Sequence, residues 1–106
     1  MSKGIVKLPP KLESSVTSAF RDLLKEKHPE WKIVKLSIMG QKDWPDYEVL
    51  AQDGQNAYVE FKRPGKEPTE RQHEMLKWLN DNGHLAEWFD NAKEAVQWLE
   101  DFLVGV

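Results

Sequence analysis

The stretch WPDYEVLAQDGQNAYVEFKRPG, residues 44–65, predicts two neighbouring antiparallel strands joined at Asp53-Gly54. The length of the loop decides which side chains share a face of this hairpin. A two-residue loop would place Asp46 and Glu60 on opposite faces. A three-residue loop, formed by a type I turn followed by glycine in the left-handed region with a bulge, would place them directly opposite each other on one face.

The three-residue loop is favoured because it separates polar from apolar side chains. Two carboxylates then lie about 5 Å apart and repel each other by roughly 3 kcal/mol at an effective dielectric constant near 20. Lys62 on the same face, or a divalent cation, would relieve this repulsion. The polar face would carry Asp46, Glu48, Leu50, Tyr58, Glu60 and Lys62, and the apolar face Tyr47, Val49, Ala51, Ala57, Val59 and Phe61.

Two interpretations of the paired acids follow from the residues alone. Carboxylate ligands in a chain with no cysteine and no paired histidines suit Mg²⁺ or Mn²⁺ better than zinc. The alternative is an exposed sheet face with solvated acids and an ion pair between Glu60 and Lys62.

The composition fits one domain over residues 1–106, with residues 1–10 as a loose basic arm. The net charge of -3 gives no strong signal for a partner, but the first 11 residues hold three lysines and no acid. The absence of cysteine excludes disulfides and thiolate sites. No apolar run reaches the ~18–20 residues of a membrane span, and no signal-peptide core is present, so the expected location is the cytoplasm.

The remaining pattern predicts the element order α-β-β-β-α-β-α, a mixed α/β (α+β) fold in which helices flank a central mixed sheet. The fourth strand is reached through a helix and is expected to lie parallel to a neighbour, after a right-handed crossover. Helices are expected from residue 9 to 27, from 69 to 82 and after 91, and strands over 31–39, 46–51, 56–62 and 85–89.

In each of two predicted helices, one polar residue lies on the apolar face. Glu13 precedes Val16 and Phe20 at helical spacing, and Gln72 stands in the same relation to the apolar residues of the second helix. Buried polar groups need partners, which a shared metal and water cluster would supply. The alternatives are a first-turn acid favoured by the helix dipole and a glutamine that only closes a capping box with Thr69.

At this point the sequence resembles a known family. Pro45-Asp46, Glu60-Phe61-Lys62 and Gln72, in this order, are similar to the PD-(D/E)xK nuclease superfamily. The run VEFKRPG followed by TERQHEMLKWLNDNGH resembles its VRR-NUC branch, the virus-type replication-repair nuclease domain. The similarity extends over residues 13–103.

The residues before the proline depart from the family pattern. Lys42-Asp43-Trp44 stands where a glycine close to the proline is expected. Asp43 would substitute for Asp46 or compete with it near a metal, and Trp44 would shape the DNA entrance. Trp78 lies off the apolar stripe of its helix and would face a partner subunit or DNA.

The resemblance implies a restriction-endonuclease-like core and a metal-dependent DNA endonuclease using Mg²⁺ or Mn²⁺. Asp46, Glu60 and the main-chain carbonyl of Phe61 would bind the metal, and Glu13 would bind it directly or through water. Lys62 would orient or deprotonate the attacking water, and Gln72 would support the water or the lysine. DNA phosphates would be contacted by Lys3, Lys7, Lys11, Arg63, Lys66 and Arg71.

The resemblance also suggests a phage-type homodimer that cuts branched DNA such as four-way (Holliday) junctions, where two symmetric sites suit a two-fold substrate. Two other function classes stay open. One is a weakly catalytic or non-catalytic DNA-binding module of a phage replication or repair complex. The other is a structural domain whose acidic face is simply solvated.

Overall fold

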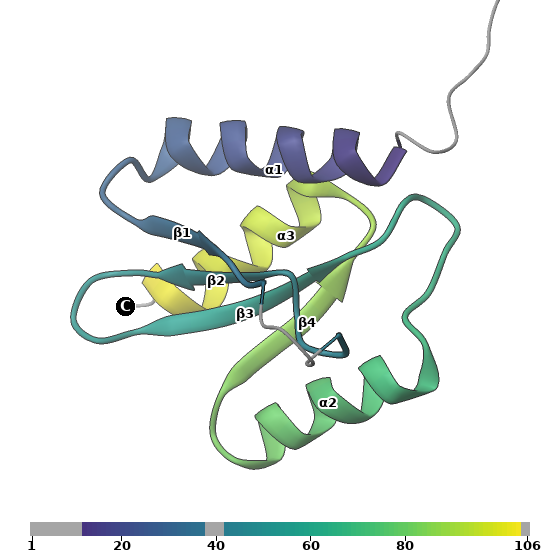
Figure 1. The fold of residues 1–106 in the computed structure, drawn as a ribbon. Helices are drawn as coiled ribbons and strands as arrows, with labels where there is room; N and C mark the ends of the chain where they lie inside the picture. Colours follow the sequence, from purple (N-terminus) through teal and green to yellow (C-terminus); the bar gives the residue numbers. More distant parts are fainter. Residues whose placement is uncertain (1–11, 38–41, 105–106) are drawn as a thin grey trace, which may run out of the picture.

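The computed structural model describes residues 12–37 and 42–104, and the element order within them confirms the predicted α-β-β-β-α-β-α fold (Figure 1). In this part of the chain no helix is long and apolar enough to cross a bilayer. The basic residues Lys3, Lys7 and Lys11 lie outside the described residues. The elements are α1 (Leu12–Lys27), β1 (Lys32–Lys35), β2 (Tyr47–Leu50), β3 (Asn56–Phe61), α2 (Glu70–Asp81), β4 (Leu85–Phe89), α3 (Ala92–Leu99) and a closing π-helical segment, η3 (Glu100–Val104).

The four strands form one sheet in the order β1-β2-β3-β4. The first two pairings are antiparallel, and β3 pairs with β4 in parallel. The chain makes this parallel connection through α2, as the helix between the third and fourth strands predicted. The expected mixed sheet flanked by helices is therefore confirmed.

The β2–β3 register is the predicted one, but the turn that sets it is different. Tyr47 lies opposite Val59 at the end of the paired range, and extending this register by one residue would bring Asp46 opposite Glu60. Asp53 and Gly54 both have positive φ angles, 63° and 77°, which is typical of a mirror-image type I′ turn. The expected type I turn, with glycine alone in the left-handed region, is therefore wrong.

Gln52 explains how a two-residue turn gives the register of a three-residue loop. The Gln55 amide donates to the Gln52 carbonyl at 3.4 Å, and the Ala51 amide donates to the Gln55 carbonyl at 2.9 Å. Two residues of one strand thus face one residue of the other, which is a bulge. Asp53 tolerates the left-handed region better than most residues do.

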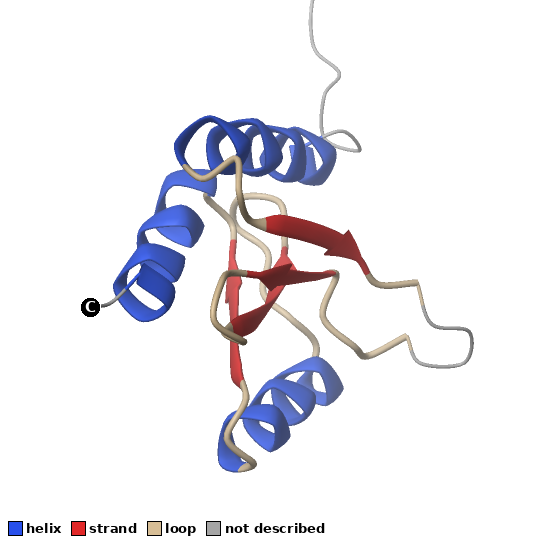
Figure 2. Cartoon of the chain, turned by 90° about the vertical axis from the view of Figure 1, so that its left-hand side faces the viewer, coloured by secondary structure: helices blue, strands red, loops and turns tan. Residues whose placement is uncertain are grey.

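The two faces of the sheet have different coverings (Figure 2). Helices α1 and α3 lie against one face, where Val49, Val59 and Phe61 are fully buried with Phe20 of α1 and Leu99 of α3. Helix α2 lies against the other face and forms a smaller apolar cluster there. The predicted polar face of the hairpin is the face toward α2, so the acids lie on the less covered side. The smaller cluster is centred on Leu76, Leu79 and Ala86.

Candidate functional site

The candidate site lies at the end of the β2–β3 hairpin opposite its turn, where β2 begins and β3 ends. Asp46 immediately precedes β2, and Glu60 is the penultimate residue of β3. Glu60 is 2% exposed and is the only buried charged residue among those described. An exposed face of solvated acids, the simpler alternative, therefore does not describe Glu60.

Glu60 has two neighbours that bind its carboxylate. The Gln72 side-chain amide donates to Oε2 of Glu60 at 3.2 Å. Nζ of Lys62 lies 3.5 Å from the same oxygen, and this lysine is itself largely shielded from solvent. The ion pair with Lys62 expected on the sheet face is therefore present, but in a buried setting where an unpaired charge would be costly.

Gln72 has both of the roles suggested by its position in the sequence: it closes a capping box and it is a partner for a buried polar group. Its backbone amide donates to Oγ1 of Thr69, while its Oε1 accepts from the Thr69 amide at 2.9 Å, which completes a capping box at the start of α2. Its Nε2 remains available and reaches Glu60. The cap fixes the side chain at the helix N-terminus and so directs its amide toward the carboxylate.

Asp46 and Pro45 together change the backbone bonding of Phe61. If the alternating antiparallel pattern set by the Ala51–Gln55 bond were extended past the last pair of the ladder, Tyr47–Val59, Pro45 and Phe61 would be the next hydrogen-bonding pair. The Phe61 amide donates instead to Oδ2 of Asp46 at 2.9 Å. Pro45 has no amide hydrogen, so it cannot donate to the Phe61 carbonyl. A buried carbonyl oxygen beside two carboxylates is thereby left with no ladder donor from β2.

Burial raises the pKa of Asp46 above its ordinary value of 3.8, against the opposing effects of the Phe61 amide and of Lys62 and Lys35. Its ionised form is therefore less favourable in the folded protein than in water. A nearby cation would reverse this preference.

The donor set fits a hard divalent cation only in part. Two carboxylates and a main-chain carbonyl are oxygen ligands of the kind that Mg²⁺ and Mn²⁺ bind, with water in the remaining positions. No group of three or more acidic, histidine or cysteine side chains that could hold a metal occurs among residues 12–37 and 42–104. The backbone of Glu13 lies in the first turn of α1, but its side chain is outside the described part. A further carboxylate from this residue is therefore a prediction.

The basic residues expected to contact DNA are distributed unevenly around the site. Arg63 directly follows Lys62 and is half-buried, and Lys66 is exposed in the loop before α2. Arg71 is exposed on α2, and its Nε lies 3.1 Å from Oδ2 of Asp43. The carboxylate of Asp43, considered as a rival of Asp46, thus binds an arginine and joins the β1–β2 connection to α2.

Trp44 packs at the foot of α2. Its ring meets that of Tyr58 edge-on at a centroid distance of 6.3 Å, and both rings lie against the Leu76–Leu79 cluster. The sequence identified Trp44 as a departure from a pattern, but Tyr58 only as a member of the polar face. The contact between the β1–β2 connection and β3 could not be predicted, because no periodic pattern in the sequence pairs a loop residue with a strand residue.

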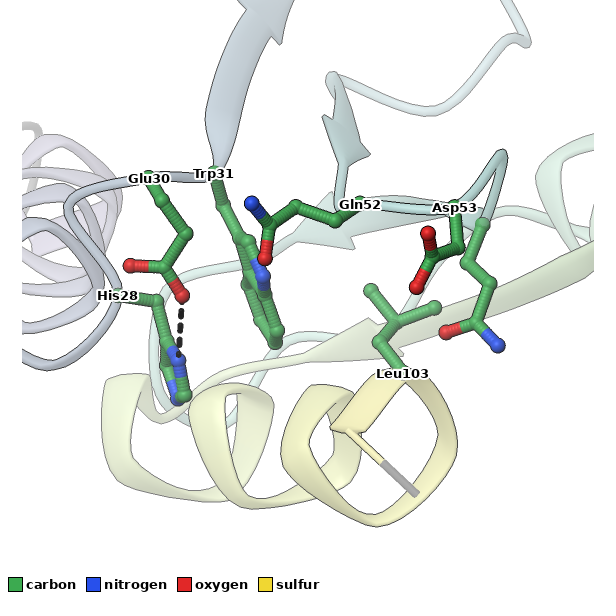
Figure 3. Close-up of a pocket in the computed structure, with 7 residues that line it drawn as sticks. His28, Glu30, Trp31, Gln52, Asp53 and Leu103 are labelled. Atoms are coloured by element: carbon green, nitrogen blue, oxygen red, sulfur yellow. Dashed lines mark ion pairs between the residues drawn. The ribbon is translucent and has the colours of Figure 1, made fainter. Parts of the chain in front are cut away.

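A cavity of about 270 Å³ lies at the other end of the hairpin, beside its turn (Figure 3). Trp31 and His28 stand on one side of it, and Asp53 and Leu103 on the other. His28 lines this cavity with both ring nitrogens next to acids: Nδ1 lies 3.6 Å from Glu30, which also lines the cavity, and Nε2 lies 2.9 Å from Glu100.

Comparison with known proteins places the fold but gives no sequence relative. The chain matches no protein-family model and no curated protein. A solved structure described as a VRR_NUC domain superposes with a TM-score of 0.73 over 85% of this chain and 96% of that one, at 20% sequence identity. The chain therefore has the fold of a VRR_NUC domain, as the resemblance in sequence predicted.

Proposed function

We propose that this protein is an Mg²⁺- or Mn²⁺-dependent endonuclease that hydrolyses phosphodiester bonds of DNA. One observation carries the proposal: Asp46 accepts the Phe61 amide at the end of β3, and Lys62 and Gln72 lie against the buried carboxylate of the preceding residue, Glu60. The VRR_NUC fold supports it, because the two structures share this fold over 85% of the present chain.

Each residue has a separate task in this proposal. Asp46, Glu60 and the Phe61 carbonyl would hold the cation, with Glu13 adding a ligand directly or through water. When bound, the cation polarises the phosphate and lowers the pKa of a bound water. Lys62 orients or deprotonates the attacking water and stabilises the negative charge that develops on the phosphate. Gln72 holds Glu60 in place through its Nε2.

The proposed substrate is duplex or branched DNA, including four-way junctions, cut by a homodimer with one site in each subunit. Phosphates would be neutralised by Lys3, Lys7, Lys11, Arg63, Lys66 and Arg71. The Arg71 side chain contacts Asp43 through Nε and is 77% exposed. It would therefore be accessible to a DNA phosphate, which would replace the Asp43 carboxylate as its partner.

The test is a cleavage assay on labelled duplex, flap, fork and four-way-junction DNA in Mg²⁺, Mn²⁺ or EDTA. Wild type should cut only with metal, and Asp46→Ala and Lys62→Ala should lower the rate by at least about 100-fold. Glu48→Gln is the matched control, because Glu48 lies on the same face but binds Asn56. DNA that is bound and never cut would favour the binding-module alternative, and no binding at all would leave the acids a structural role.

A further inference from the structure

The face of the sheet toward α2 is covered over only half its width. Helix α2 packs on the β3–β4 half, where its buried leucines meet Ala86. On the β1–β2 half, Val34 is 39% and Leu50 is 38% exposed. Lys32 lies opposite Leu50 in the register and so shares this face. A strip with two exposed apolar side chains, Val34 and Leu50, and with Lys32 and the half-buried Glu48 beside them thus runs along the sheet next to α2.

One side of α2 is directed toward the connection between β1 and β2. Arg71, Met75 and Trp78 follow each other at spacings of four and three residues, which places them on one side of the helix. The ion pair between Arg71 and Asp43 shows that this side faces the β1–β2 connection. Trp78 is 55% exposed, the largest exposed fraction among the large apolar residues described.

A series of neighbouring rings extends from Trp78, on this side of α2, to Trp44, two residues before Asp46 of the candidate site. Trp78 stacks on His84 with ring planes 19° apart, His84 meets Tyr58 edge-on, and Tyr58 meets Trp44. The centroid separation is 6.3 Å in each of the three pairs. Together Trp78, His84, Tyr58 and Trp44 form what is here named the aromatic track.

The aromatic track is close to the proposed catalytic residues. Tyr58 is two residues before Glu60 in β3 and lies on the same face. Trp78 is six residues beyond Gln72 in α2, which is about 9 Å along the helix axis. That distance corresponds to two or three stacked nucleotides at about 3.4 Å each.

We propose that the aromatic track binds an unpaired DNA strand by stacking its bases, with Trp78 as the outermost platform. This inference rests on the proposed nuclease function and narrows its substrate to DNA with a single-stranded segment, such as a flap or a splayed arm. Trp78 and His84 are the exposed rings of the track, while Tyr58 and Trp44 are half-buried. Exposed aromatic rings stack on any base, whereas the bases of a continuous duplex are already stacked on each other. Lys32 and Arg71, on the two sides of the strip, would hold the phosphates of such a strand.

Binding of fluorescent oligo(dT), measured by anisotropy in EDTA at low salt, tests the proposal without cleavage. Trp78→Ala should weaken binding about tenfold, the loss expected for one base–aromatic stack. Trp78→Phe should recover most of it. Phe102→Ala is the matched control, because Phe102 is 53% exposed and its ring contacts Trp98 of α3. It is not part of the aromatic track, although it lines one cavity together with His84. This variant should bind within twofold of wild type.

The proposal would be overturned if the wild type bound no oligo(dT), or if wild type and Trp78→Ala bound it equally. Equal weakening in Trp78→Ala and Phe102→Ala would also overturn it. His84→Ala, whose ring lies under Trp78, gives a second variant should Trp78→Ala fail to fold by circular dichroism. If the wild type binds oligo(dT) through Trp78 but never cuts DNA, the proposed nuclease function fails and the proposed binding site remains supported. If the wild type cuts DNA and Trp78→Ala binds oligo(dT) as well as the wild type does, the nuclease function is supported and the proposed binding site fails.

Discussion

Pro45 and Asp46 act on the same neighbour, Phe61, and in complementary ways. The proline supplies no amide hydrogen for the Phe61 carbonyl, and the aspartate accepts the Phe61 amide at 2.9 Å. Pro45 thus ends the hydrogen-bond ladder, and Asp46 accepts the hydrogen bond of the Phe61 amide. The pairing of proline with an acid at this place has a physical reason: together they expose a carbonyl oxygen beside a carboxylate without leaving a buried amide unpaired.

Asp46→Asn should stabilise the metal-free protein at pH 7 by on the order of 1 kcal/mol. The raised pKa of Asp46 means that the folded protein binds this proton more tightly than the unfolded chain. Ionised Asp46 therefore costs stability as the pH rises above about 3.8, its ordinary value. Asparagine stays neutral and keeps an oxygen for the Phe61 amide. Urea unfolding in EDTA at pH 7 measures the difference.

The same pair of proteins gives its own checks. The advantage of Asp46→Asn should shrink toward pH 3, where Asp46 is protonated in both states. Millimolar Mg²⁺ should raise the melting temperature of wild type and of Glu48→Gln but not of Asp46→Asn, because ligands that bind only the folded state stabilise it. A variant less stable than wild type in EDTA at pH 7 would contradict the account.

At the scale of elements, the features that follow from local alternation and capping could be predicted from the sequence. The β2–β3 register could be predicted because only one register buries Val49, Val59 and Phe61 together, and all three are fully buried. The capping box of α2 could be predicted from Thr69 and Gln72. The turn type could not, because a type I′ turn with a bulge and a type I turn with glycine give the same register.

Contacts between distant elements could not be predicted in the same way. Asp43 and Arg71 are 28 positions apart, and nothing in the spacing of either marks the other as its partner. The stacking of Trp78 on His84 depends on α2 ending at Asp81 and on Gly83, whose φ of 89° turns the chain back toward the sheet. A sequence pattern predicts which face of a helix or strand a residue lies on. It does not predict which residue of another element packs against that face.

The double use of Gln72 at the start of α2 leads to a paired prediction. Thr69→Ala and Gln72→Ala should each cost about 1 kcal/mol of stability, since each breaks the capping box. Only Gln72→Ala should also reduce metal-dependent cleavage, by roughly 10- to 100-fold, because only Gln72 bonds to Glu60. Urea unfolding and cleavage rates of the two variants, measured under the same conditions, provide the comparison.

Equal losses of cleavage in both variants would show that the cap, and not the bond to Glu60, matters for the site. Gln72→Glu separates the two roles further. A glutamate can still accept the Thr69 amide in a capping box, but it would place a second carboxylate against Glu60. Stability should then be retained better than cleavage.

On the scale of the whole molecule, the sheet separates a stabilising side from the side proposed to bind substrate. The α1–α3 side holds the larger apolar core, and the α2 side holds the paired carboxylates and the exposed rings. The stabilising side is closed by His28 at the end of α1, which stacks on Trp31 at 4.0 Å and lies 2.9 Å from Oε2 of Glu100 in η3. One side chain thus ties the first helix to the last.

Glu100→Gln should reveal this closure as a pH-dependent part of the stability. The hydrogen bond from His28 lowers the pKa of Glu100 below its ordinary value of 4.5, with Lys27 contributing. For a carboxyl with a lowered pKa in the folded state, the stabilisation is present above about 4.5 and is lost as the pH falls through the folded value. At pH 7 we expect a loss of about 1 kcal/mol in the variant, because the bond involves a charged group that is only partly exposed.

Urea unfolding of wild type and Glu100→Gln at intervals from pH 7 to pH 3 measures this contribution as a difference, so that groups titrating equally in both proteins cancel. The gap should be largest at neutral pH and should close toward pH 3. Metal-dependent cleavage and oligo(dT) binding at pH 7 should be unchanged, since Glu100 lies on the α1–α3 side of the sheet. A gap that stays constant with pH would mean that Glu100 acts through packing. A change in cleavage would mean that the two sides of the sheet are coupled.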